Sequence, residues 1–128
     1  MKDFEAKVEK YLKERGWSTM QPADLAKSIS IESAELLEIF QWSNPSVIEV
    51  QKNKEMRAHV EAELADIMIY CFDLSVVLGL NTQKILEKKL AAVRKKYPAK
   101  LMKQHAADGT ATDLYWKIKK EHRTKRLS

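Results

Sequence analysis

Apolar residues recur at helical spacing along most of the chain, and short polar breaks divide this pattern into segments. The first segment ends at Gly16, and the second begins at Pro22, a residue favoured in the first turn of a helix. The stretch "SNPS" separates the second segment from the third, which has a candidate break near Asn53. The pattern therefore predicts four α-helices, over residues 3–15, 22–42, 46–79 and 82–96.

The sequence after Pro98 does not continue the helical pattern directly. A loop is expected through Asp108 and Gly109, followed by a short amphipathic helix over "TDLYWKIKKEH". The chain has only 3 Gly and 3 Pro, too few for a turn-rich β-sandwich or barrel. We therefore expect an all-α fold, with a four-helix bundle over residues 1–100 and a basic C-terminal tail over residues 101–128.

The net charge of +5 is unevenly distributed. Residues 1–97 carry 15 basic and 15 acidic side chains, whereas residues 98–128 carry 8 basic and 3 acidic ones. A basic tail can contact nucleic acid or another acidic surface, although such tails are more often simply solvated. The main domain has no charge bias toward DNA, so nucleic acid is not an expected partner.

The single cysteine and the longest apolar stretch bear on location. Cys71 cannot form an internal disulfide, which favours a reducing compartment such as the cytoplasm, and its place in "IMIYCF" predicts a small core residue. Asp66 and Asp73 interrupt the longest apolar stretch. We therefore expect no membrane span.

Glutamates lie on the apolar side of the second predicted helix. At about 100° per residue, Glu32 falls within about 20° of both Leu25 and Ile39. Glu35 is one turn further on, and Glu38 lies toward the edge of the same face. Glu32 is therefore expected to point into the core rather than to water.

The third predicted helix repeats this anomaly. It is apolar nearly all round from Leu64 onward, which predicts a buried helix, yet it contains Glu63 and Asp66 three residues apart. Buried carboxylates that repel each other require protons or cations, and no Lys or Arg occupies either apolar stripe. A hard divalent cation such as Mg²⁺, Ca²⁺ or Mn²⁺ suits such a site. The alternative is that these acids lie at helix ends and face solvent or surface lysines.

Three motifs occur in a specific order: "IESAELLEIFQW", "ELADIMIY" and "KKLAAVRKKYPA". Over about Trp17 to Lys100 they resemble the MazG-type all-α nucleotide pyrophosphohydrolases, in the branch of the dCTP pyrophosphatases. The resemblance implies hydrolysis of nucleoside triphosphates to monophosphate and pyrophosphate, with Mg²⁺ as cofactor and Mn²⁺ as a possible substitute. The implied metal ligands are Glu32, Glu35, Glu63 and Asp66. The implied catalytic residue that orients or deprotonates the attacking water is Glu35 or Glu38, and Glu38 is also a candidate ligand of a second metal.

The resemblance also implies substrate contacts and subunit pairing. Trp42 and Tyr70 would lie near the base or sugar, and Trp17 would close over the base. Lys89 would approach phosphate, with Lys96 nearby. Because helices of this family pair across subunits, a homodimer or homotetramer is implied.

Two departures from the family pattern concern the base. Members of this branch often carry Phe-His before the proline of the second helix, where this chain has Thr19 and Met20 in "TMQP". They often carry Asn where this chain has Val93. Neither Met20 nor Val93 hydrogen-bonds well, so a broad or altered preference is expected rather than strict dCTP specificity.

Two other interpretations compete with the pyrophosphohydrolase: a different kind of metalloenzyme and a protein without catalytic activity. A di-iron carboxylate bundle expects Glu-x-x-His pairs, and no His stands three residues after a Glu here. A non-catalytic helical binding module could use the basic tail on nucleic acid or a protein partner, but it leaves the buried acids unexplained. A metal titration separates that module from the enzyme.

Overall fold

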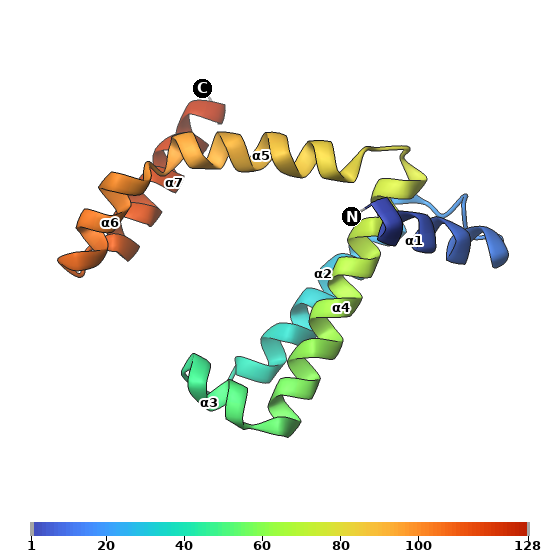
Figure 1. Ribbon diagram of the computed structural model, residues 1–128, viewed down its shortest axis with the longest axis horizontal. Helices are drawn as coiled ribbons and strands as arrows, with labels where there is room; N and C mark the ends of the chain where they lie inside the picture. The colour runs from blue at the N-terminus through green and yellow to red at the C-terminus, as the bar shows by residue number, and fades with distance from the viewer. Residues whose placement is uncertain (1, 128) are drawn as a thin grey trace. The chain divides into compact units, whose positions relative to one another are not determined.

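The computed structural model describes residues 2–127, which form seven α-helices and no strand (Figure 1). The all-α prediction is therefore confirmed, although Met1 and Ser128, the outer ends of the two predicted domains, lie outside the described residues. The helices are α1 (Lys2–Glu14), α2 (Pro22–Phe40), α3 (Val47–Lys52), α4 (Lys54–Val77), α5 (Thr82–Lys96), α6 (Ala99–Ala107) and α7 (Ala111–Leu127). They fall into two compact units, Met1–Gln83 and Lys84–Ser128.

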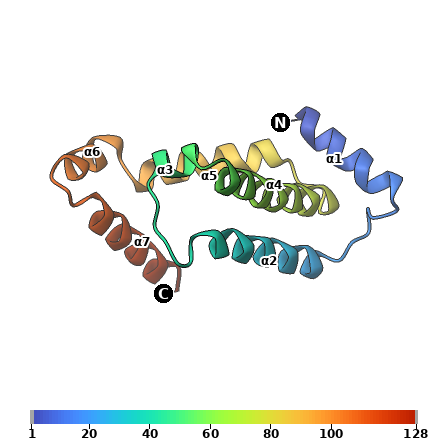
Figure 2. The same cartoon turned by 90° about the horizontal axis from the view of Figure 1, so that it is seen from below.

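The first unit is organised around α4. Helices α2 and α4 run antiparallel side by side, and the short α3 lies in the connection between them (Figures 1 and 2). Helix α1 packs on α4 and buries Val8 and Leu12 against Phe72. This small apolar cluster fixes α1 on α4.

The predicted break near Asn53 is confirmed, and it divides the expected third helix into α3 and α4. The side chain of Asn53 accepts a hydrogen bond of 3.0 Å from the backbone N–H of Met56 and so caps the start of α4. Ser46 caps α3 in the same way through the N–H of Glu49, at 3.2 Å. Both caps satisfy backbone donors that a helix start leaves without partners.

A tight turn at the end of α1 places Trp17. Gly16 adopts a φ of 67°, which a residue with a Cβ rarely adopts. The N–H of Trp17 donates to the carbonyl of Leu12 at 2.8 Å, and the N–H of Gly16 donates to that of Lys13 at 3.1 Å. This is the Schellman pattern of helix ends, and it turns Trp17 back beside Tyr11.

In the second unit, a helix is found where a loop was predicted after Pro98. Residues Ala99–Ala107 form helix α6, which packs on α7 (Figure 2), and only a short turn at 108–110 separates the two helices. Because this segment is rich in Ala, Leu, Met and Lys, its residues favour a helix once α7 offers a packing partner.

The prediction that α4 is buried nearly all round is wrong for this chain. Leu64 and Met68 are 47% and 52% exposed, and Cys71, predicted to be a core residue, is exposed as well. These residues lie about 80–140° around the helix from Glu63, so α2 does not cover them. None of the described helices is long and apolar enough to cross a membrane.

Candidate metal centre and adjoining cavities

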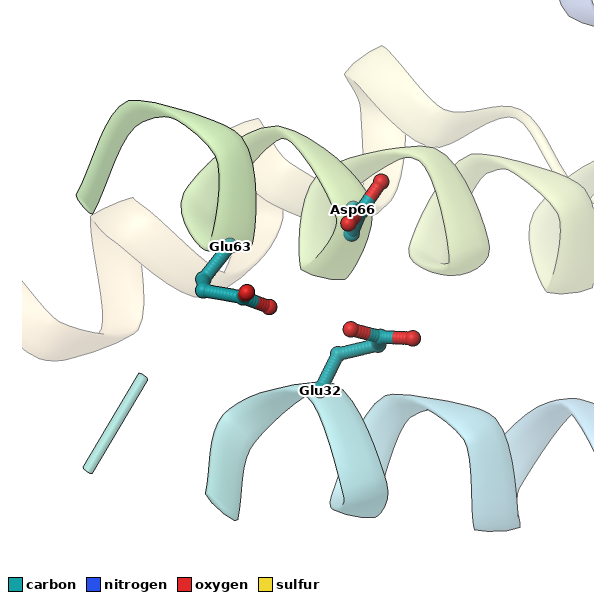
Figure 3. Close-up of side chains that lie close together, drawn as sticks. All are labelled: Glu32, Glu63 and Asp66. Atoms are coloured by element: carbon teal, nitrogen blue, oxygen red, sulfur yellow. The ribbon is translucent and has the colours of Figure 1, made fainter. Parts of the chain in front are cut away.

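Three carboxylates from two helices converge in the first unit. Glu32 projects from α2 toward Glu63 and Asp66 on α4 (Figure 3). One carboxylate oxygen from each residue lies within 4.8 Å of the others. The antiparallel packing of α2 on α4 creates this arrangement, because Glu63 and Asp66 are one turn apart on the side of α4 that faces Glu32.

The cluster is electrostatically unsatisfied. The pKa of Glu32 is raised to about 7, mainly because the side chain is removed from water. The hydrogen bond with Glu35 and the charge of Glu35 raise it further. The same causes raise the pKa of Glu63. The Oε2 atom of Glu63 is buried and has no hydrogen-bond partner among the described residues. No ion pair of residues 2–127 includes Glu32, Glu63 or Asp66.

These residues fit a divalent cation. Several carboxylate oxygens face one another across the α2–α4 contact, and hard cations such as Mg²⁺ and Mn²⁺ prefer such ligands. A bound cation would also partner the orphaned Oε2 of Glu63. Glu35 is exposed, as Asp66 is, and its interactions with Glu32 and Glu63 place it beside them.

A polar hollow of about 340 Å³ adjoins the acid cluster on one side. Glu35 and Glu38 from α2 line it, together with His59 and Glu63 from α4. Sequence reasoning assigned no role to His59. The available signal was its spacing, since His59 stands four residues before Glu63 and therefore shares its side of the helix.

A larger cavity of about 640 Å³ adjoins the cluster at Asp66, between α1 and α4. Its lining is mostly aromatic and apolar, with three charged side chains: Phe4, Lys7, Val8, Tyr11, Trp17, Met20, Asp66, Ile69, Tyr70 and Asp73. Trp17 and Tyr70, singled out separately in the sequence, therefore share one cavity. Trp17 meets the Tyr11 ring edge-on at 5.9 Å, and the guanidinium of Arg15 lies 4.0 Å from the centre of that ring.

The remaining predicted site residues lie elsewhere. Trp42 follows the end of α2, is 89% exposed and lines none of the cavities described for residues 2–127. Lys89 and Lys96 belong to the second unit, where they line a basic cavity of about 600 Å³ with Lys119 and Arg123. The substrate roles of Trp42, Lys89 and Lys96 stay predictions.

The raised pKa of Glu32 predicts how the metal-free fold depends on pH. In chelator, folded Glu32 holds its proton up to about pH 7, whereas the unfolded chain releases it near 4.5. The resulting stabilisation is complete below pH 4.5 and is lost as the pH rises through about 7. Thermal unfolding between pH 4.5 and 8 should therefore show a decline that Glu32→Gln reduces. Equal slopes for the two proteins would contradict a proton held at Glu32.

Comparisons with known proteins agree with this architecture. The chain matches dCTP pyrophosphatase 1 of Rattus norvegicus with 29% identity over 99 residues, covering 76% of this chain and 58% of the rat protein. It matches dCTP pyrophosphatase 1 of Homo sapiens with 31% identity over 90 residues, covering 69% of this chain and 53% of the human protein. The chain thus spans little more than half the length of these curated relatives.

A solved structure and a family match extend the comparison. The crystal structure of a pyrophosphatase from Archaeoglobus fulgidus superimposes with a TM-score of 0.65 and 37% sequence identity, covering 77% of this chain and 92% of that one. The model of the MazG-like family matches residues 27–114 of this chain. This range includes the converging acids of α2 and α4 and most of the second unit. On this match, the chain belongs to the MazG-like family.

Proposed function

We propose that this chain is a Mg²⁺-dependent pyrophosphohydrolase that converts nucleoside or deoxynucleoside triphosphates to the monophosphate and pyrophosphate. One observation carries the proposal: carboxylates of Glu32, Glu63 and Asp66 converge without a partner cation beside an aromatic cavity. Family membership and the pyrophosphatase names of the relatives support it. The proposed catalytic domain covers residues 1–100, and residues 101–128 form the basic tail.

The proposed roles follow from chemistry and position. Glu32, Glu35, Glu63 and Asp66 hold Mg²⁺, for which Mn²⁺ can substitute. When bound, the cation supplies Lewis acidity and neutralises triphosphate charge. Glu35 or Glu38, at the polar hollow, orients a water molecule and accepts its proton as it attacks the α-phosphorus in line, so that pyrophosphate leaves.

Recognition of the nucleotide is assigned to the aromatic cavity and to lysines. Trp17 and Tyr70 offer ring faces on which a base or sugar can pack, and such stacking tolerates several bases. Trp42 is proposed to add a further ring. Lys89 and Lys96 are proposed to neutralise phosphate oxygens, in keeping with the basic lining of their cavity.

We further propose that the chain assembles as a homodimer, or as a dimer of such dimers, through an apolar stripe on α4. The stripe consists of Leu64, Met68 and Cys71, which lie on one side of the helix and are exposed. Contiguous exposed apolar side chains on a soluble fold mark an interaction surface. A second copy of the same helix supplies a complementary apolar face in a two-fold dimer.

The reaction type predicts the products. Incubation with Mg²⁺ and a mixture of common ribo- and deoxyribonucleoside triphosphates should yield pyrophosphate and monophosphates, because attack at the α-phosphorus leaves the β- and γ-phosphates joined. Chromatography of the nucleotides and an enzymatic assay of pyrophosphate measure this directly. Release of orthophosphate with a nucleoside diphosphate would place the attack at the γ-phosphorus and refute the proposed reaction. A protein that binds nucleic acid but hydrolyses no triphosphate would favour the binding module instead.

A further inference from the structure

A second buried carboxylate lies in the aromatic cavity, apart from the metal cluster. Asp73 is only 4% exposed, and its Oδ1 atom has no hydrogen-bond partner among the described residues. It stands seven residues after Asp66, so both side chains lie on the same side of α4, about 10 Å apart along the helix axis. Both line the cavity between α1 and α4.

The carboxylate of Asp73 belongs to none of the ion pairs of residues 2–127, although the exposed Lys7 lines the same cavity. An unpaired carboxylate removed from water is unfavourable for folding, and burial raises the pKa of Asp73 accordingly. A polar ligand that donates a hydrogen bond into the cavity would relieve this cost.

The cavity around Asp73 has the composition of a base-binding pocket. Tyr11 and Trp17 present aromatic rings, on which a flat base can stack. Asp66 connects the cavity to the metal cluster at one end, and Asp73 stands two helical turns away, a separation that a nucleoside can span. Stacking faces accept any base, so selection among bases depends on a polar group such as Asp73.

We infer that Asp73 accepts a hydrogen bond from the exocyclic amino group of the nucleotide base, and so selects cytosine or adenine over uracil or thymine. A carboxylate accepts well from an amino group such as N4 of cytosine, whereas uracil and thymine present a carbonyl oxygen there, which repels it. This inference rests on the proposed function and narrows it. Because Met20 and Val93 hydrogen-bond poorly, the sequence predicted a broad preference among bases. The role of Asp73 restricts this preference to the bases that carry an amino group.

The sharpest test compares dCTP with dUTP, whose bases differ at C4, where cytosine has an amino group and uracil a carbonyl, and at the neighbouring N3, which carries a hydrogen only in uracil. The wild type should show a kcat/KM for dCTP at least about tenfold higher than for dUTP. Asp73→Asn, whose amide can both donate and accept, should reduce this ratio by about tenfold or more. Asp3→Asn makes the same chemical change at an exposed position of α1 and should leave the ratio unchanged.

Binding without turnover separates this inference from the proposed activity. Calorimetric titration should give tighter binding of dCMP than of dUMP to the wild type, and Asp73→Asn should remove the difference. If no triphosphate is hydrolysed but this difference is found, the base-reading role stands and the proposed activity fails. If hydrolysis proceeds with a base ratio that Asp73→Asn does not change, the inference is overturned while the activity stands.

Two further measurements complete the test: the thermal stability of the Asp73→Asn variant and the binding of nucleotides to the wild type alone. Without ligand, Asp73→Asn should unfold at the same temperature as the wild type or higher, because an unpaired charge is removed. A marked loss of stability with an unchanged dCTP to dUTP ratio would show a structural role and refute the inference. Wild-type protein that does not distinguish dCMP from dUMP would refute it without any variant.

Discussion

Replacing Glu63 with glutamine should abolish triphosphate hydrolysis while leaving the metal-free fold as stable as the wild type, or more stable. The substitution keeps the shape of a side chain that meets Glu32 and Asp66 in the cluster, but it removes one of the charges that repel. It also removes a proposed metal ligand, so kcat/KM should fall by at least about 10²-fold. Pyrophosphate release in Mg²⁺ and thermal unfolding in chelator measure the two effects.

The same two proteins also test whether Mg²⁺ binding stabilises the fold through Glu63. Mg²⁺ at 100 times its dissociation constant should stabilise the wild type by about 2.7 kcal/mol, and this gain should be largely lost in Glu63→Gln. Glu61→Gln is the matched control, since Glu61 lies on the same helix but pairs with Arg57 at the surface. A Glu63→Gln protein that is markedly less stable in chelator would mean that Glu63 has a structural partner and that the proposed site is wrong.

Two glutamates placed on the apolar stripe of α4 should dissociate the proposed dimer. Leu64→Glu combined with Met68→Glu puts charges where the proposal buries apolar side chains. Burial of one such side chain contributes about 1.5–3 kcal/mol, and each position occurs twice in a two-fold interface. The dissociation constant should therefore rise by more than about 10³-fold, which light scattering after size-exclusion chromatography detects as a halved mass.

The control for this experiment adds the same charges on another side of α4. Ala58→Glu with Ala62→Glu has the same i,i+4 spacing at exposed positions and should leave the mass unchanged. A wild-type protein that is monomeric at micromolar concentration would contradict the dimer. A double variant at Leu64 and Met68 that keeps the wild-type mass would place the interface elsewhere.

The helices of the first unit and the acids that converge between α2 and α4 could be predicted because local chemistry specifies them. Gly16 ends α1, and Asn53 caps α4 through its own side chain. The carboxylates of Glu32 and Asp66 stand out because they interrupt apolar stripes of known period. Such signals depend only on neighbours in the sequence, so they can be read without the fold.

Most of the errors concern features that tertiary contacts decide. Helix α6 is the exception in part: it packs on α7, but Gly109, with a φ of 80°, ends it as Gly16 ends α1, and this signal was available in the sequence. Cys71 lies in an apolar run, yet the pattern does not say which part of the run another element covers. Asp73 could be read only as an interruption of that run, because its burial and its orphaned oxygen depend on how α1 packs on α4.

The separation of the acids from the aromatic wall has a consequence for how such proteins diversify. The acids belong to the α2–α4 pair, whereas most of the aromatic wall belongs to α1 and the turn after it, anchored by Val8 and Leu12. Substitutions along α1 can reshape the pocket without moving any acid of the cluster. If the proposed function holds, drift or laboratory selection can thus exchange one base preference for another while the acids proposed for hydrolysis are kept.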